Sequence, residues 1–446
     1  MSITTKPDPQ QHDSRPSERP SRARYAMLAL ILIATIINYV DRVNISVAAP
    51  FLAKDLGIDK VQLGLIFSAF SWTYAFALVP GGYLVDRFGS RLMYSVSLVA
   101  WSAATVIQGF ASGFASLFVS RLGVGLMEAP AFPANTRAVT MWFPQRERGL
   151  ATSIFLVGQY VATALFSGLL LWLTVSYGWR AVFFVTGGIG VVFGFVWLAL
   201  YRDPLQSRRI NQAELSYIEE GGGLARNAAQ SPVTVRQVMQ LFRYRQIWAV
   251  CLGKFASNSA LTFFLTWFPT YLIEERRMTM LKAGIFTVLP YLGATVGILA
   301  AGAISDMLIR RGVSMSFARK LPLVVGSALG MSIILVNITD SNELCIAILT
   351  LAFFAQGISS TSWAAVSEIA PKELIAVTGG VTSFAANLTG IITPVVIGII
   401  VQRTGSFVWA INLVAFLSLC GTLSYSLLLG RIHRIVLVPE DAHHAA

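Results

Sequence analysis

The sequence predicts an all-α integral membrane protein with twelve transmembrane helices arranged as two six-helix bundles. The chain of 446 residues is 55% hydrophobic and only 13% charged, whereas soluble domains carry about 25% charged residues. The charged residues gather in short clusters between apolar runs of about 20 residues or more, enough for a helix to cross a hydrocarbon core of about 30 Å. A long polar stretch in the middle of the chain separates six of these runs from six others.

The apolar runs are expected to be helical because lipid offers no partner for backbone N–H and C=O groups. In the first half of the chain they cover residues 25–52, 61–85, 92–112, 114–140, 149–176 and 179–201. In the second half they cover residues 246–273, 281–308, 320–338, 342–368, 374–401 and 406–430.

The segments outside the runs complete the predicted organisation. Residues 1–24 are polar and lack an apolar core, so we expect a disordered cytoplasmic tail and not a secretory signal peptide. Residues 25–201 form the N-terminal six-helix bundle and residues 246–430 the C-terminal one. Between them, residues 202–245 form a cytoplasmic linker with room for a short surface helix, and residues 431–446 form a second cytoplasmic tail.

The positive charge of the chain is explained by membrane topology. The net charge is +12, and with a cytoplasmic N-terminus about 24 of the 34 Lys and Arg residues lie on the cytoplasmic side and about 7 on the other. This bias predicts a multi-pass membrane protein with both termini in the cytoplasm. The sequence holds no basic domain, so we expect the lipid bilayer, and not nucleic acid, as a partner.

Residues suited to catalysis or to metal binding are few. The four His residues all lie in the tails, and the three Cys residues are scattered in or near the apolar runs. This distribution predicts no disulfide framework, no metal site and no His-based catalysis. The sequence also has no clustered nucleophile and base and no Walker loop, so we expect neither an enzyme nor ATP-driven transport.

A charged glycine motif follows the second run and recurs after the eighth, with the same Gly-to-Asp spacing. Such internal duplication is a feature of transporters. The Gly allows close helix approach, and the Asp can pair with basic residues or cap a neighbouring helix in one conformation and release it in another. The alternative is a plain charged loop. The predicted gating residues are Gly82, Asp86, Arg87, Gly89 and Arg91 in the first copy, and Gly302, Asp306 and Arg310 in the second.

The six-and-six division and the Gly-x-Leu-x-Asp-Arg-x-Gly-x-Arg loop resemble the major facilitator superfamily. Within it, several strings resemble the anion:cation symporter family, above all bacterial proton-coupled carriers of D-galactonate and of glucarate or galactarate. The resemblance runs over most of residues 25–430 and implies the major facilitator fold. The strings are Asn38-Tyr39-Val40-Asp41-Arg42, Glu128-Ala129-Pro130-Ala131-Phe132-Pro133-Ala134-Asn135, Trp142-Phe143-Pro144 and Phe264-Leu265-Thr266-Trp267-Phe268-Pro269.

Five ionisable residues lie inside the predicted spans: Asp41, Arg42, Arg121, Glu128 and Lys254. Such residues cost about 2.5–3.5 kcal/mol each to insert, which makes them functional candidates. Counted along the helices, Asp41, Arg42 and Arg121 share one level in the outer half of the membrane. Glu128 lies two turns below Arg121 on the same helix face. This polar stripe suits a path for protons and an anion.

We expect proton binding and anion binding to be coupled through these charges. Protonating Asp41 and Glu128 would free Arg42 or Arg121 for a substrate carboxylate, which an Arg fork can bind with two parallel hydrogen bonds. The resemblance implies the same roles: in similar carriers the residues matching Asp41 and Glu128 carry the proton, and the residue matching Arg42 meets the carboxylate. The alternative is a static set of buried ion pairs that only fixes helix packing.

Polar side chains in other spans are candidates for binding the hydroxyl groups of a sugar acid. Tyr74 and Gln159 match polar site positions of the galactonate carriers, and Tyr39 lies one turn before Arg42. The other three lie in the unusually polar tenth run, where Trp363 could pack against the sugar chain. The alternative for each is an interhelical hydrogen bond worth about 0.6 kcal/mol. These candidates are Tyr74 and Gln159, then Tyr39, then Ser360, Ser362 and Trp363.

Three positions depart from the galactonate carriers. Ser383 stands where those carriers have a site Asn, and Asn387 one turn later is more like the glucarate-type carriers. Lys254 stands where these relatives have Gln. It either meets a second substrate carboxylate, which would favour a diacid, or extends its amine toward the cytoplasm. The substrate site is therefore expected to include Lys254, Ser383 and Asn387.

Together these observations predict a secondary active transporter that imports a hexonate or an aldarate by proton symport, with no cofactor other than the proton as coupling ion. Its site would lie between the two bundles, which rock around it. The alternatives are a proton-coupled carrier or exchanger of another organic anion, such as an aromatic acid, tartrate or a hexuronate. A membrane sensor would carry a large signalling domain, which this sequence lacks. We expect a monomer.

Overall fold

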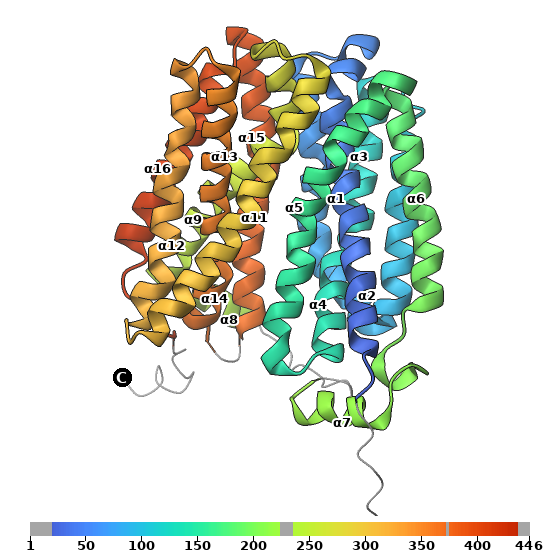
Figure 1. Cartoon of the computed structure of the whole chain (residues 1–446), viewed down its shortest axis with the longest axis vertical. Helices are drawn as coiled ribbons and strands as arrows, with labels where there is room; N and C mark the ends of the chain where they lie inside the picture. Colours follow the sequence, from blue (N-terminus) through green and yellow to red (C-terminus); the bar gives the residue numbers. More distant parts are fainter. Residues whose placement is uncertain (1–19, 224–234, 372–373, 436–446) are drawn as a thin grey trace, which may run out of the picture.

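The computed structural model describes residues 20–223, 235–371 and 374–435, and within them every regular element is helical. Figure 1 shows two helical bundles side by side, one formed by the first half of the chain in blue to green and one by the second half in yellow to red. The predicted fold class is confirmed. The parts of the predicted tails and linker at residues 1–19, 224–234 and 436–446 lie outside the described residues.

The first bundle contains six helices. One of them, α2, covers two of the predicted spans, and a further predicted span is divided between α3 and α4. The 49-residue α2 breaks at Gly89, where φ is 82° and ψ is 156°, a conformation that favours glycine. The span predicted at 114–140 is interrupted at Ala129 and Pro130, because proline at 130 cannot donate to the helical ladder. The helices are α1 (Ala23–Leu56), α2 (Lys60–Gln108), α3 (Phe114–Glu128), α4 (Ala131–Trp142), α5 (Gln145–Tyr177) and α6 (Trp179–Leu200).

The second bundle has the same number of crossings, with interruptions near its centre. The seventh crossing changes pitch at Trp267, next to Pro269, and the tenth breaks at Ser360 and Thr361. The elements are α9 (Arg245–Thr266), α10 (Phe268–Thr270), η2 (Tyr271–Glu275), α11 (Met280–Arg310), α12 (Met315–Gly330), η3 (Met331–Ile338), α13 (Asn342–Ser359), α14 (Ser362–Ile369), α15 (Ile375–Thr404), α16 (Val408–Leu423) and η5 (Ser424–Leu428).

Ten helices in the described residues are long and apolar enough to cross a membrane. Because α2 covers two of the predicted spans, and because α3 and α4 together form one more that is too interrupted to count, the crossings number twelve as predicted. Large apolar side chains cover the outer faces of both bundles, as expected where lipid replaces water. Examples are Phe110, Trp172, Phe195, Ile338 and Phe416, all exposed.

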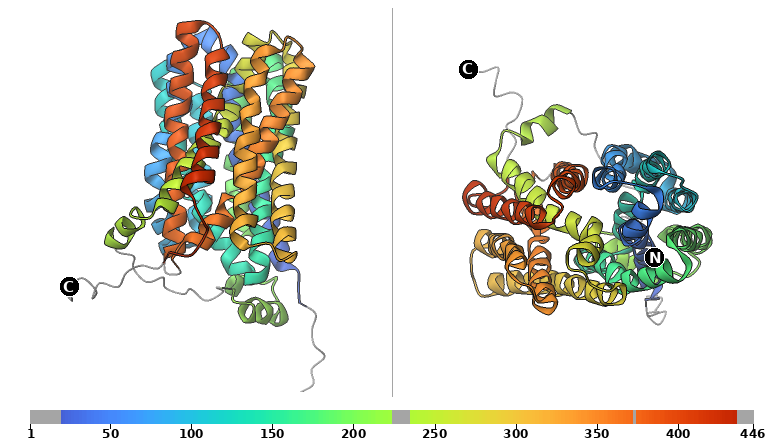
Figure 2. Two further views of the ribbon diagram at one scale, coloured as in Figure 1. Left: turned by 90° about the vertical axis from the view of Figure 1, so that its left-hand side faces the viewer. Right: turned by 90° about the horizontal axis from the view of Figure 1, so that it is seen from above.

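The linker contributes three short helices at one end of the molecule: η1 (Pro204–Gln206), α7 (Gln212–Glu220) and α8 (Val235–Leu241). Figure 2 shows α7 and α8 at the same end of the two bundles. We call this the linker end and the opposite one the far end. The Asn211 side chain caps α7 by accepting a hydrogen bond from the Glu214 N–H at 3.0 Å.

The two bundles meet tightly at the far end. The backbones of α2 and α15 approach so closely that a Cβ on Gly64 would lie 2.5 Å from the Pro394 carbonyl oxygen. Lys60 adds an ion pair from its Nζ to Glu274, and its N–H donates to Gln402 Oε1 at 3.0 Å. At the linker end, the motif after the second crossing is instead exposed, including Tyr83, Leu84, Asp86 and Phe88. The structure is therefore closed at the far end.

Substituting Gly64 by valine should destabilise this closed state. The added side chain overlaps backbone atoms of α15, and such overpacking costs about 1–3 kcal/mol, or about a 5- to 150-fold shift between open and closed forms. Pulsed EPR distances between labels at the far ends of α2 and α15 should lengthen in Gly64→Val. The control is Gly188→Val in α6, where a Cβ meets nothing within 4 Å. Unchanged distances in Gly64→Val would contradict the contact.

Candidate functional site

Asp41 and Arg42 are neighbours on α1 but face different partners. The Asp41 side chain is fully buried, and its Oδ2 accepts a hydrogen bond from Trp101 Nε1 of α2 at 3.1 Å. Arg42 instead pairs with Glu128, the last residue of α3: its Nε donates to Glu128 Oε1 at 2.6 Å, and its Nη2 contacts the same oxygen. The fully buried Glu128 carboxylate is thus matched by an arginine from another helix.

Three aromatic rings surround the Arg42 guanidinium. Its central carbon lies 4.9 Å from the ring centroid of Tyr39, 4.7 Å from that of Phe70 and 4.9 Å from that of Tyr74. Cation–π contacts of this kind hold a guanidinium in one orientation while leaving its edge free for hydrogen bonds. The Arg42 side chain stays 19% exposed, so the guanidinium is reachable from the cavity beside it.

Arg121 is held by the backbone of α1. Its Nη1 donates to the Asp41 carbonyl oxygen at 3.2 Å and its Nη2 to that of Arg42 at 3.1 Å. The side chain is buried, and its guanidinium lies 5.3 Å from the Phe70 ring. Arg121 therefore positions the segment that carries the two charged residues, and its predicted contact with a substrate stays a prediction.

A cavity next to Arg42 is lined, as far as the described residues go, by side chains of α1, α2, α4 and α5 in the first bundle. It brings together four of the predicted site residues. It also includes polar residues that the sequence reasoning missed, among them Asn135, whose Nδ2 donates to Thr35 Oγ1 at 3.3 Å. The spacing of four residues between Asn38 and Arg42 places both on one helix face and could have identified Asn38. The polar lining residues are Thr35, Asn38, Tyr39, Arg42, Tyr74, Asn135 and Gln159.

Both buried carboxylates keep one oxygen that lacks a hydrogen bond within the described residues. These atoms are Asp41 Oδ1 and Glu128 Oε2. A buried carboxylate oxygen without a donor is costly, because water has been removed and nothing replaces it. Each atom is thus a place where a proton can bind.

The predicted site residues of the second bundle whose side chains the structure describes do not line this cavity. The Lys254 Nζ of α9 donates to Thr382 Oγ1 of α15 at 3.3 Å, and one turn later Asn258 Nδ2 donates to the Ala386 carbonyl oxygen at 2.8 Å. Lys254 thus lies in a polar seam between α9 and α15. Its buried amine does not extend to the surface.

The other predicted residues of the second bundle lie near helix breaks or make local bonds. Ser360 stands at the break between α13 and α14, and Ser362 is buried at the start of α14. Asn387 Nδ2 donates to the Ser383 carbonyl oxygen at 2.9 Å. The side chain of Trp363 lies outside the described residues. One hydrogen bond joins the bundles near this level, from Tyr160 Oη of α5 to Gln356 Oε1 of α13 at 3.4 Å.

The two copies of the charged glycine motif lie at the linker end and differ in their contacts. In the first copy, Asp86 and Arg87 are exposed, and Arg91 Nε donates to the Leu198 carbonyl oxygen at 3.1 Å. In the second copy, Asp306 pairs with Arg319 at 3.2 Å and Arg310 is exposed. A Cβ on Gly302 would meet nothing within 4 Å, and one on Gly82 would only touch Pro133 at 3.9 Å. In this conformation neither glycine is needed for a close helix approach.

The described residues hold no group of three or more His, Cys, Asp or Glu side chains that could bind a metal ion. The charged groups that the site offers for chemistry are two carboxylates and two guanidinium groups.

Comparison with known proteins gives consistent matches over most of the chain. Residues 31–394 match the model of the Major Facilitator Superfamily. The chain is 42% identical over 423 residues to a D-galactonate transporter of Escherichia coli O6:H1, covering 94% of this chain and 98% of that one. It is 42% identical over 435 residues to the probable galactarate/D-glucarate transporter GudP of Escherichia coli K12, covering 95% and 97%.

Among solved structures, the chain is similar to a bacterial homolog of the human lysosomal transporter Spinster in an inward-facing and unoccupied conformation. The TM-score is 0.73 at 18% identity, over 92% of this chain and 98% of that one. This likeness concerns the fold alone. The family resemblance predicted from the sequence is confirmed by these comparisons.

Replacing Trp101 by phenylalanine should lower the thermal stability of the detergent-solubilised protein by several degrees. The change removes the hydrogen bond that Trp101 donates to the Asp41 carboxylate, and an unsatisfied buried group costs about 1–3 kcal/mol. Trp197→Phe is the matched control, because Trp197 is equally buried but its Nε1 has no hydrogen bond within the described residues. Equal losses in both variants would show that ring size, and not the bond to Asp41, matters.

Proposed function

Because the chain belongs to the major facilitator superfamily, we propose that it is a secondary active transporter that imports a sugar acid together with protons. The proposal is supported by the names of its relatives, which are a D-galactonate transporter and a probable galactarate/D-glucarate transporter. Family membership places the chain among transporters and not among enzymes. The observation that carries the proposal is that Arg42 lines a cavity with many polar side chains while it pairs with the buried Glu128.

We assign the linker end to the cytoplasm of a bacterium, with both termini there. The excess of Lys and Arg in the tails and the linker supports this orientation. The contacts of Lys60 with Glu274 and Gln402 then close the extracellular side. The conformation is in that case inward-facing, and the cavity beside Arg42 releases its substrate toward the cytoplasm.

Arg42 is the group best placed to bind the carboxylate of the substrate. Its guanidinium is fixed by three rings, faces the cavity and can make two parallel hydrogen bonds to a carboxylate. The hydroxyl groups of a hexonate or an aldarate would meet the amides of Asn38, Asn135 and Gln159 and the phenols of Tyr39 and Tyr74. This concentration of hydrogen-bonding groups favours a polyhydroxy acid over an aromatic acid.

A proton on Glu128 and a substrate carboxylate on Arg42 each replace one partner of the Arg42–Glu128 ion pair, so each favours the binding of the other. While Glu128 is ionised, its oxygen occupies donors of the Arg42 guanidinium. A proton on Glu128 weakens the pair and frees those donors for a substrate carboxylate. Asp41 faces Trp101 on the other side of α1 and supplies a second proton site without touching Arg42. Binding of protons and anion together also reduces the charge that must move against an inside-negative potential.

Replacing Glu128 by glutamine should abolish proton-driven accumulation and preserve substrate exchange. Uptake into proteoliposomes would be measured for galactonate, glucarate, galactarate, glucuronate and an aromatic acid, with and without an inward proton gradient. The parent protein should accumulate a sugar acid only with the gradient. Glu128→Gln should still exchange labelled for unlabelled substrate, since a neutral side chain mimics the protonated acid. Accumulation by the variant at the level of the parent would make Glu128 structural.

Replacing Lys254 by methionine should lower the uptake of glucarate and galactonate by the same factor. The Lys254 amine is bonded to Thr382 in the seam between α9 and α15, so its loss weakens helix packing whatever the substrate. Thr382→Val removes the other partner of this bond and should have a similar effect. A loss confined to the diacid glucarate would instead show that Lys254 meets a second carboxylate.

A further inference from the structure

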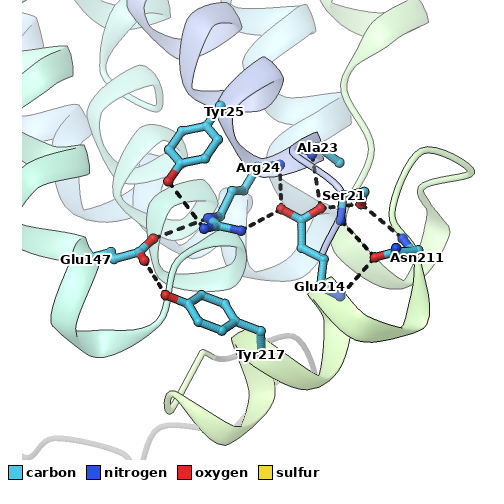
Figure 3. Close-up of polar contacts among 8 residues, drawn as sticks. All are labelled: Ser21, Ala23, Arg24, Tyr25, Glu147, Asn211, Glu214 and Tyr217. Carbon is cyan, nitrogen blue, oxygen red and sulfur yellow. Dashed lines mark hydrogen bonds and ion pairs between the residues drawn. The ribbon is translucent and has the colours of Figure 1, made fainter. Parts of the chain in front are cut away.

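The linker helix α7 carries a glutamate that is fully buried although it lies on a short helix at the end of the molecule. Glu214 accepts hydrogen bonds from the backbone N–H groups of Ala23 and Arg24 at 3.0 and 3.3 Å. Its carboxylate also accepts from Ser21 Oγ at 2.5 Å and from Arg24 Nη1 at 2.9 Å. Figure 3 shows both oxygens of Glu214 directed at the start of α1.

These bonds supply a cap that α1 does not provide for itself. The residue before α1, Arg22, makes no side-chain capping bond. A carboxylate at a helix N-terminus satisfies free N–H groups and complements the helix dipole. In addition, Asn211 Oδ1 accepts from the Ser21 N–H at 3.0 Å, and the Asn211 N–H donates to Ser21 Oγ at 3.1 Å. The starts of α1 and α7 are therefore bonded to each other.

Arg24 extends the same cluster to the start of α5. Its Nε donates to Glu147 Oε2 at 3.2 Å, and Tyr217 of α7 donates to the other oxygen of that carboxylate. The guanidinium is held between the rings of Tyr25 and Tyr217, at 4.6 and 4.9 Å from their centroids. Beyond this cluster, the Gln145 N–H donates to the Gly221 carbonyl oxygen at 2.8 Å. The helix α7 thus fastens the ends of α1 and α5 together.

The fastened helices are the two that carry most of the polar cavity wall. Arg42 lies about 28 Å along α1 from Ala23, and Gln159 about 21 Å along α5 from Gln145. The only proline within α1 is Pro50, beyond Arg42, so the segment between the cluster and the cavity is an unbroken helix. The helices touch along the way, because a Cβ on Gly158 would lie 2.8 Å from Leu32 Cδ1. A shift at the linker end is transmitted to the cavity.

We propose that Glu214 is a positioning residue: by fastening α1 to α7 and, through Arg24 and Glu147, to α5, it sets the register of Arg42 against Gln159. This inference rests on the proposed function, since it concerns the affinity for the transported sugar acid. One residue of slip moves a helix by about 1.5 Å, and errors of about 1 Å in the placement of binding groups have large effects. The linker is then part of the substrate site, although it lies far from the cavity.

The test compares Glu214→Gln with Glu220→Gln in full-length protein reconstituted in proteoliposomes, with galactonate and glucarate as probes. Glu220 lies on the same helix but is exposed, so its variant controls for the change of charge. Glu214→Gln should raise the KM for uptake about tenfold and change the maximal rate little, because the site is displaced while the transport cycle is intact. Glu220→Gln should match the parent protein. Equal KM values in both variants would overturn the inference.

A second pair of variants separates positioning from helix stability. Arg22→Asp in the Glu214→Gln background gives α1 a cap of its own and should restore thermal stability but not the KM. Glu147→Gln keeps the cap, removes the ion pair that joins Arg24 to α5 and should raise the KM by itself. If Arg22→Asp restores the KM, or if Glu147→Gln leaves the KM unchanged, Glu214 acts only as a helix cap and not as a positioning residue. If Glu214→Gln does not fold, the KM of Glu147→Gln alone decides whether the cluster positions the site. If the parent protein takes up neither probe, the proposed function itself is overturned.

Discussion

The ion pair between Arg42 and Glu128 is the interaction around which the rest of the site is arranged. Two charges removed from water lose hydration, and only close contact and further hydrogen bonds offset that loss. The surrounding residues supply part of this compensation through the rings of Tyr39, Phe70 and Tyr74. One oxygen of Glu128 has no donor among the residues that the structure describes, so the compensation is incomplete. Because the compensation is incomplete, binding of a proton to Glu128 or of an anion to Arg42 can separate the pair more easily than it could separate a fully hydrogen-bonded pair.

One interruption of a helix lies directly beside the charged residues of the site, and another lies beside a predicted site residue of the second bundle. Glu128 is the last residue of α3, directly before Ala129 and Pro130, and Ser360 follows the last residue of α13. In lipid, an interrupted helix is tolerated only where protein or a cavity satisfies its free backbone groups. The continuous helices α1 and α5, in contrast, carry cavity residues such as Arg42 and Gln159, which must stay at a fixed distance from each other. Arg121 helps to keep this spacing, because its guanidinium donates hydrogen bonds to the backbone carbonyl oxygens of Asp41 and Arg42 on α1.

The spans, their division into two halves and the charged residues of the site could be predicted from the sequence, because each depends on composition along one helix. The neighbours of each residue could not. Asp41 and Arg42 are adjacent, so they point about 100° apart and meet different helices. Lys254 pairs across a seam with Thr382, a residue type that carries no signal in an apolar span. A glutamate in a polar linker resembles any surface charge, and the burial of Glu214 follows only from the start of α1, far away in the sequence.

The charges of the site are distributed unevenly between the bundles. Asp41, Arg42, Arg121 and Glu128 all belong to the first bundle, and so do the described residues that line the cavity beside Arg42. The contacts between bundles at the far end involve close backbone packing and a half-buried ion pair, with Tyr160 and Gln356 nearer to the cavity. The second bundle can therefore move without separating a buried charge from its partner. In the proposed symport, proton binding and anion binding would both take place within the first bundle, and the second bundle would respond by opening one side or the other.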